Sequence, residues 1–434
     1  MIRLQIPTLA SALRELRKRV GMLPVSDDTP EESSAIRIQR YVDPNKWGVA
    51  AIESWSRTHG RLSTKQIWDH MVHYLHDDES VPVDFRYFMD GIQRTTPIGR
   101  VRLRKNTFET VPIHLAQIGT VLLKRENRKL IQEDERIQIL LEYPGAFVQS
   151  ESNISALKED LLEAVRSQVG NVVLGVDTSF SVKKLRTNEA LPGLQVKEID
   201  GIQYPRVPND ELWKWCADPA QFRGQARRWT TRFRDIEEQR LYDNALKRLT
   251  DHPTGSPHSF VIKDGPLTHT RGGVTKMALG VIKSFSTIFL DRSQMTKVLG
   301  LVYGYRSPVF TKRRPEGDLE EEEIYDFETA DKKLTLVSWY VRIRPVANHD
   351  PMWGLLRIEM HSDVLPCKGH AARWDEKDTL LIDAISRQLS TEVSPSSHPD
   401  PRWHNLIYPI KSCEFFLRSR ILPHATAHHL LGGM

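Results

Sequence analysis

The first 81 residues carry apolar side chains at helical spacing. The segments 6–20 (IPTLASALRELRKRV) and 63–78 (STKQIWDHMVHYLHDD) each repeat apolar residues every three or four positions, which is the period of an amphipathic helix. Ser63 and Thr64 are suitable N-caps for the second segment. The pattern therefore predicts a mostly helical N-terminal region over residues 1–81.

From residue 82 onward the pattern changes to the alternation and the short apolar runs of β-strands. Three strands come first and predict a meander: 84–91 (DFRYFMDG), 98–106 (IGRVRLRKN) and 112–127 (PIHLAQIGTVLLKREN). Later strands are predicted at 171–177, 258–264, 275–285, 334–345 and 353–361, and helices at 152–168, 219–249, 293–304, 376–390 and 410–421. The proline-containing stretch 181–212 is predicted to be an insertion. Because strands and helices interleave, the fold class is α/β, with one central mixed sheet and flanking helices.

Composition places the chain among globular proteins. It has 434 residues, of which 39% are hydrophobic and 27% charged, enough for one large or two moderate domains. No apolar run approaches the roughly 18 residues of a membrane span, and the N-terminus has charges within its apolar pattern, unlike a signal peptide. We therefore expect a cytoplasmic protein that does not enter a membrane. The three cysteines are far apart, which predicts neither a zinc ribbon nor a disulfide framework.

Positive charge is concentrated in three stretches, although the net charge is only +5. These stretches are 100–105 (RVRLRK), 223–234 (RGQARRWTTRFR) and 311–315 (TKRRP). The second combines aromatic residues with Arg227, Arg228, Arg232 and Arg234. Basic residues interleaved with aromatic ones suit a phosphate backbone and unstacked bases, so these four arginines are candidate DNA-binding residues. A solvated charged face explains the same composition.

Two predicted strands end in the same dipeptide, Asp90-Gly91 and Asp264-Gly265. Functional groups of α/β sheets collect past the carboxyl ends of strands, and glycine there lets the backbone turn or approach a ligand. Two neighbouring aspartates repel each other, and a bound divalent cation removes that repulsion. Carboxylate oxygens suit Mn²⁺ or Mg²⁺, whereas the absence of clustered Cys and His in the sequence argues against zinc.

A helix glutamate is the third candidate acid. Glu237 lies four residues from both Phe233 and Leu241 in the predicted helix 219–249, so it falls within an apolar stripe and needs a partner. Glu238, one position round the helix, is the more ordinary surface residue. The stripe favours Glu237 over Glu238, while a nearby arginine is an equally good partner for it.

The order of these motifs resembles the NurA nucleases, metal-dependent enzymes with a ribonuclease H-like core that resect DNA ends. The similarity runs over about 82–422 and includes Lys283 in 278–286 (ALGVIKSFS), the strands 339–345 (WYVRIRP) and 355–360 (LLRIEM), and 405–419 (NLIYPIKSCEFFLRS). It implies a ribonuclease H-like nuclease domain over 82–434. It also implies a homodimer that works with DNA and with a HerA-type hexameric ATPase.

Site roles follow from the same resemblance. Asp90 and Asp264 are the implied catalytic metal ligands, together with Glu237 or Glu238. The family places a histidine or aspartate after its Tyr-Pro pair, where this chain has Cys413-Glu414, so Glu414 is the candidate replacement. Lys283 is a candidate phosphate contact. His404 and His424 flank the segment and are expected to be solvated.

Two other interpretations remain open. The altered terminal motif is compatible with a catalytically degenerate DNA-binding subunit of such a complex. A carboxylate-paired hydrolase acting on sugars is the third interpretation, although the sequence lacks aromatic residues clustered around the acids. The chain also lacks a phosphate-binding GxxxxGK[ST] motif, so any ATP-driven movement must come from a partner.

Overall fold

The computed structural model describes the backbone of about half of the chain. The described residues are 40–41, 48–51, 53, 55–56, 60–61, 68, 71–75, 81–102, 110–143, 172–177, 196–199, 202–205, 219–251, 258–267, 277–283, 287–288, 290–313, 336–345, 351–368, 373–394 and 405–423. All structural statements below concern these residues.

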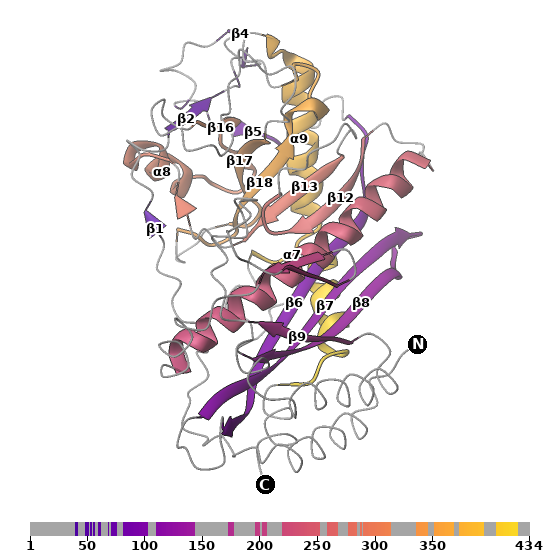
Figure 1. Cartoon of the computed structure of the whole chain (residues 1–434). Helices are drawn as coiled ribbons and strands as arrows, with labels where there is room; N and C mark the ends of the chain where they lie inside the picture. The colour runs from indigo at the N-terminus through magenta and orange to yellow at the C-terminus, as the bar shows by residue number, and fades with distance from the viewer. Residues whose placement is uncertain are drawn as a thin grey trace.

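A mixed sheet of twelve strands lies at the centre of the molecule (Figure 1). Ten of its strands follow one path: β2 (Gly48–Ala51), β16 (Phe310–Arg313), β17 (Leu336–Arg342), β18 (Leu355–His361), β13 (Ala278–Ile282), β12 (His258–Asp264), β6 (Val83–Arg102), β7 (Thr110–Glu126), β8 (Lys129–Tyr143) and β9 (Val172–Asp177). Off this path, β15 (Tyr305–Arg306) pairs with β17 and with β5 (Val72–His73). Separate pairs are β1 (Arg40–Tyr41) with β14 (Thr287–Ile288), β3 (Trp55–Ser56) with β4 (Gly60–Arg61), and β10 (Val196–Ile199) with β11 (Ile202–Pro205).

The three middle strands β6, β12 and β13 run parallel to one another, and the next strand on either side of them is antiparallel. Strands β6, β7 and β8 form an antiparallel meander, closed between β7 and β8 by a two-residue turn in which Asn127 and Arg128 both have positive φ. On the other side of β6, β12 pairs in parallel, and β13 pairs in parallel with β12. Five consecutive residues of β12 and all five residues of β13 are buried, as expected for strands covered on two faces.

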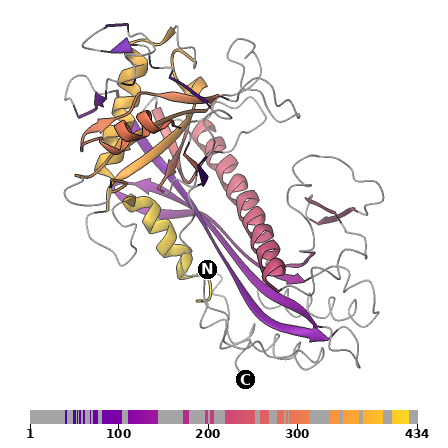
Figure 2. The ribbon, with the colours of Figure 1, turned by 90° about the vertical axis from the view of Figure 1, so that its left-hand side faces the viewer.

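Helices cover both faces of this region (Figure 2). The 33-residue α7 (Pro219–Asp251) lies along the meander and packs Leu241 and Leu246 against Met89 and Val261. The shorter α10 (Tyr408–Arg418) lies on the opposite side. The remaining helices are α8 (Arg292–Leu299), η2 (Ser362–Val364) and α9 (Glu376–Thr391), and α9 packs into the same core cluster as α10. The sheet is therefore enclosed between an α7 face and an α10 face.

Most elements predicted after residue 82 are confirmed. Helix 219–249 is α7, the strand at 258–264 is β12, and the strands and helices predicted after it correspond to β13, α8, β17, β18, α9 and α10. The stretch 181–212, predicted to be an insertion, contains the hairpin β10–β11. The helix predicted at 152–168 lies outside the described residues.

Two predictions about the first half of the chain are wrong. The helix predicted at 63–78 is contradicted at Val72–His73, which forms β5 and pairs with β15, so tertiary pairing overrides the helical pattern there. The helix predicted at 6–20 lies outside the described residues. The strands predicted at 84–91 and 98–106 are one strand, β6, with a register shift between Pro97 and Gly99.

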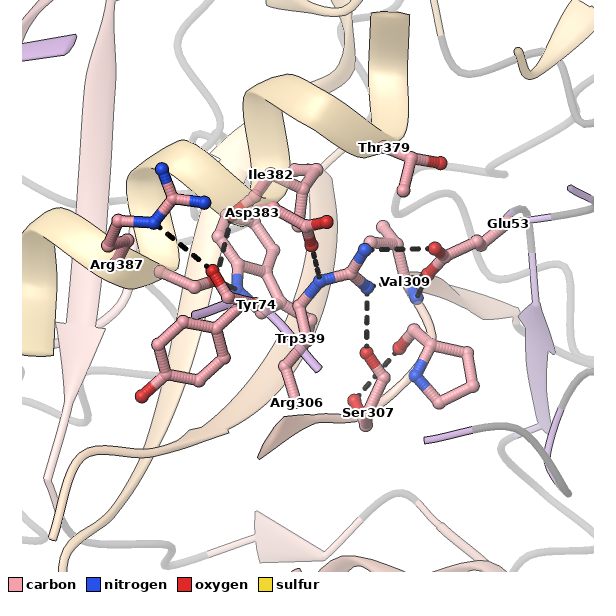
Figure 3. A network of polar contacts seen from close by, with 12 residues as sticks. Glu53, Tyr74, Arg306, Ser307, Val309, Trp339, Thr379, Ile382, Asp383 and Arg387 are labelled. Atoms are coloured by element: carbon pink, nitrogen blue, oxygen red, sulfur yellow. Dashed lines mark hydrogen bonds and ion pairs between the residues drawn. The ribbon is translucent and has the colours of Figure 1, made fainter. Parts of the chain in front are cut away.

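A buried arginine ties the N-terminal segment to the sheet and to α9 (Figure 3). The Arg306 guanidinium donates to both oxygens of Glu53 at 2.7 and 2.9 Å and to Asp383 on α9 at 2.6 Å. All three side chains are buried. Burial alone would lower the pKa of Arg306, but the charges of Asp383 and Glu53 outweigh it and raise that pKa. Arg306 is therefore a permanent cation between two carboxylates.

No helix in the described parts of the chain is both long and apolar enough to cross a bilayer.

Candidate active site

Asp90 and Asp264 lie beside each other on neighbouring parallel strands. The register pairs Lys263 with Met89, so Asp264 comes next to Asp90 one residue further along. Side chains alternate between the faces of a strand, and Phe88 and Ile262 belong to the core cluster on the α10 face. Both aspartates therefore point to the α10 face, where β12 ends.

A buried lysine pairs with Asp264, and its charge also acts on Asp90. Lys283 follows β13, and its Nζ lies 2.7 Å from Oδ2 of Asp264. Burial on its own would lower the pKa of Lys283, but the charges of Asp264, Asp90 and Glu414 outweigh it and raise that pKa. Lys283 is largely buried, because only 10% of its side chain is exposed.

Glu414 approaches the same lysine from α10. Burial would raise its pKa, but the hydrogen bond and charge of Lys411, followed by the charges of Arg418 and Lys283, lower it. The bond from Lys411 Nζ to Oε2 of Glu414 measures 2.8 Å. Glu414 thus stays ionised beside Lys283.

Cys413 is buried between α10 and β6, with Sγ 3.5 Å from the Phe88 carbonyl oxygen. Burial raises the pKa of its thiol well above the ordinary value, and the charges of Asp90 and Asp264 add to the rise. The thiol is therefore protonated and contributes no charge. Cys367, the other described cysteine, is also buried.

The negative charge of Asp90 is buried among other acids and is opposed by the positive charge of Lys283. Burial raises its pKa well above the ordinary value, and the charge of Asp264 raises it further, while Lys283 opposes the rise. Glu238 and Glu414 add smaller rises. Among the contacts of its carboxylate is a 2.8 Å hydrogen bond from the backbone N–H of Gly91. A second positive charge near Asp90 would relieve this repulsion.

Glu238 comes to the aspartates from the α7 face. Its Oε2 lies 3.2 Å from Lys263 Nζ and its Oε1 lies 3.1 Å from Arg234 Nε. Burial raises the pKa of Glu238, against the lowering effect of these two cations. A Cβ at position 91 would lie 2.3 Å from Oε1 of Glu238, so Gly91 leaves the space that this carboxylate occupies.

The two helix glutamates have different partners, and Glu238 is buried instead of lying at the surface. Glu237 is buried, as its place in the apolar stripe predicts, but its partners are Arg240 at 2.6 Å and Arg136 at 3.5 Å. Glu238, the residue assigned to the surface, is the one that acts on Asp90. The apolar stripe identified burial correctly, but it did not show which buried glutamate faces the end of β12.

The reason given for the first Asp-Gly pair is also corrected. Strand β12 ends at Asp264, as predicted, and Gly265 has φ of 93°. Strand β6, by contrast, runs on through Gly91 to Arg102. Gly91 therefore makes room for Glu238 and does not turn the chain.

The arginines proposed to contact DNA lie on α7. Arg227 is exposed, whereas Arg234 is engaged by Glu238 and Asp235. The side chains of Arg228 and Arg232 lie outside the described residues, as do His404 and His424. Exposed positive charge near the start of α7 is thus shown for Arg227.

The partners of Glu238 are Lys263 and Arg234, and the sequence analysis did not predict either contact. Lys263 precedes Asp264 within an apolar strand. A lysine inside such a strand needs a buried anion as its partner. Lys263 was therefore the residue in the sequence that indicated a buried acid nearby.

The donor chemistry of the site fits a divalent cation. Carboxylate oxygens are hard ligands of the kind that Mn²⁺ and Mg²⁺ prefer. The charges of three carboxylates act on the buried ammonium group of Lys283, so this group supplies positive charge to the acids. No group of three or more His, Cys, Asp and Glu side chains in the described part is already arranged to hold a metal ion. Lys283 would therefore have to move from Asp264 for a cation to bind there.

Comparisons with known proteins find distant similarity among solved structures. No family model matches the chain, and no curated protein matches it. Among solved structures, the crystal structure of the NurA nuclease from Sulfolobus solfataricus matches with 15% sequence identity and a TM-score of 0.28, covering 78% of this chain and 81% of that chain. A TM-score of this size does not establish a shared fold, so the site must be judged by its own geometry.

Proposed function

We propose that the protein is a metal-dependent nuclease that hydrolyses phosphodiester bonds at DNA ends, with Mn²⁺ or Mg²⁺ as cofactor. The observation that carries the proposal is the place of Asp90 and Asp264 next to each other on neighbouring strands where β12 ends, with the buried Lys283 paired to Asp264 and the charges of Asp90 and Glu414 also acting on it. Ligands of α/β sheets bind outside the carboxyl ends of strands. The end of β12 is accessible to solvent at Asp264, because 23% of that side chain is exposed.

The sheet order supports the ribonuclease H-like part of the proposal. The meander β6–β7–β8 is extended by β12 and then β13, both in parallel with β6. The two aspartates lie on the first strand of the meander and on the strand added beside it. An acid from each flanking helix, Glu238 from α7 and Glu414 from α10, then completes the set.

Each residue has a separate task in this proposal. When bound, a divalent cation activates water and neutralises the charge that develops on the phosphate. Asp90 and Asp264 would hold the cation, with Glu414 as a further oxygen donor. Glu238, paired with Lys263 and Arg234 on the α7 face, would act on Asp90 through its charge. Lys283, released from Asp264, would hold a phosphate next to the bond that is cleaved. Arg227 and its neighbours on α7 would bind the DNA backbone.

The partners are proposed from the resemblance of the motifs. The protein would act in the cytoplasm as a homodimer, with a HerA-type hexameric ATPase that feeds DNA to it. A second candidate function is the degenerate DNA-binding subunit. The observation that favours it is the 2.7 Å ion pair between Lys283 and Asp264, which satisfies one aspartate without a metal.

A DNA degradation assay distinguishes these functions. End-labelled linear duplex and single-stranded DNA would be incubated with the purified protein in Mn²⁺, in Mg²⁺ or in EDTA. We expect shortening of DNA that requires the metal and that weakens as salt rises, because phosphate contacts release counterions. Binding without shortening in any metal would support the degenerate subunit. The absence of both binding and shortening would contradict the nuclease and the subunit together.

A further inference from the structure

The chain that follows Asp264 crosses directly over the next strand. Asp264 pairs with Val281 of β13, and the backbone N–H of Gly265 donates to the Val281 carbonyl oxygen at 2.9 Å. Gly265 then takes φ of 93°, a conformation that favours glycine. The segment 265–267 is thereby turned onto β13 on the α7 face, where Leu267 packs with Ala278.

Gly280 leaves the space through which this segment passes. A Cβ at position 280 would lie 2.8 Å from the Gly265 carbonyl oxygen and 3.0 Å from the Leu267 nitrogen. Both are backbone atoms, so they cannot move aside by changing a rotamer. Any side chain at position 280 would displace the segment, and Asp264 with it.

A fully buried carboxylate fastens the same segment. Glu359 on β18 is the direct neighbour of Gly280 across the antiparallel pair, and residues opposite each other point to the same face. Its Oε2 accepts the Leu267 N–H at 3.1 Å, and its Oε1 lies 3.4 Å from Nη2 of Arg357. A buried carboxylate is costly unless its hydrogen bonds are made. Here one of them holds the loop after Asp264.

We propose that Glu359 and Gly280 are positioning residues that fix Asp264 at the end of β12 through the segment 265–267. This inference rests on the proposed function, because Asp264 is the residue whose placement it explains. Glu359 acts on Asp264 through the Leu267 N–H. The loop is held at one end by the ladder of β12 and β13 and at the other by Glu359 and the packing of Leu267.

The test compares three variants in the full-length protein. Glu359→Leu removes the acceptor, Glu359→Gln keeps an oxygen for the Leu267 N–H, and Gly280→Ala fills the crossing point. Gly119→Ala is the matched control, because a Cβ there meets only side-chain atoms at 3.1 and 3.2 Å. Thermal unfolding of each variant shows which ones are folded.

Three readouts are measured on the folded variants: hydrogen exchange of the amides at 264–267, the Kd for Mn²⁺ by calorimetry, and the kcat and KM for DNA. Glu359→Leu and Gly280→Ala should each speed exchange, raise the Kd for Mn²⁺ by roughly 10–100-fold and lower kcat with little change in KM. Glu359→Gln and Gly119→Ala should stay close to the parent in all three.

The outcomes separate this inference from the proposed function. If the parent cleaves DNA and folded Glu359→Leu and Gly280→Ala match it in exchange, Kd and kcat, the inference is overturned and the proposed function stands. If the parent does not cleave DNA, the proposed function fails, and the positioning role is then decided by hydrogen exchange alone. Unchanged exchange of the amides at 264–267 in Glu359→Leu and Gly280→Ala would overturn the positioning role, and faster exchange would support it.

Discussion

Asp90→Asn and Asp264→Asn should each lower the kcat for DNA cleavage by about 10³-fold or more, the scale expected when a group acting directly on the transition state is removed. An amide keeps the shape of the carboxylate but loses the negative charge that holds a cation. Circular dichroism would establish that both variants are folded. Cleavage within tenfold of the parent in either variant would contradict the proposed site.

The same substitution at Asp90 should have the opposite effect on stability. Its carboxylate is buried next to Asp264, Glu238 and Glu414, so removing its charge removes repulsion in the folded state. We expect the free energy of unfolding in EDTA to rise for Asp90→Asn. A variant that is more stable and yet inactive identifies a residue kept for chemistry, because a purely structural acid would lose stability on substitution.

Two adjacent glutamates provide a matched comparison for these variants. Glu238→Gln should lower kcat, because Glu238 is the helix acid that acts on Asp90. Glu237→Gln should leave kcat nearly unchanged, since its partners are Arg240 and Arg136. Both variants change one buried carboxylate on α7 into an amide. Equal losses of kcat would show that the distinction drawn between the two positions is wrong.

Arg306→Ala should lower the free energy of unfolding by about 3–5 kcal/mol, the range expected when one partner of a buried ion pair is removed. It would leave Glu53 and Asp383 buried without their shared cation. A loss of this size is a large part of the roughly 5–15 kcal/mol that stabilises a typical protein. Chemical denaturation followed by circular dichroism measures it.

The control for Arg306 is an exposed cation on α7. Lys247→Ala should change the free energy of unfolding by no more than about 0.5 kcal/mol. Adding Glu53→Gln and Asp383→Asn to Arg306→Ala should recover part of the stability, because the carboxylates left unpaired would become neutral. A loss from Arg306→Ala no larger than the one from Lys247→Ala would contradict a structural role for the buried network.

The sequence predicted the second half of the fold better than the first. Strands such as β12 and β17 contain short runs of apolar residues next to polar ones. Such runs can be recognised from the local sequence alone. The segment around Val72–His73 has apolar residues at helical spacing but pairs with β15. That pairing depends on residues more than 200 positions away and leaves no local signal.

The sequence predicted that Asp90 and Asp264 lie on neighbouring strands, but it assigned Glu238 to the surface, whereas that residue is buried. Asp90 and Asp264 stand out because each follows an apolar run and precedes glycine. The choice between Glu237 and Glu238 depends on how α7 is rotated about its axis, and one residue corresponds to a turn of about 100°. Both glutamates are buried, so an argument from burial had no means of separating them.

The repeated Asp-Gly shows the same limit. At position 265 glycine serves the backbone, with φ of 93°. At position 91 glycine leaves room for another side chain, because the carboxylate of Glu238 lies where a Cβ would be. A dipeptide in the sequence indicates that a side chain must be absent, but only the packing shows which atom occupies the space.

The central claim is that Asp90 and Asp264 share one cation. Crystals soaked in Mn²⁺ and measured for anomalous scattering test it most directly. The account predicts a peak within about 2.3 Å of carboxylate oxygens from both residues, with Lys283 Nζ moved away from Asp264. A map without a peak at these oxygens at millimolar Mn²⁺, with the ion pair between Lys283 and Asp264 intact, would contradict it.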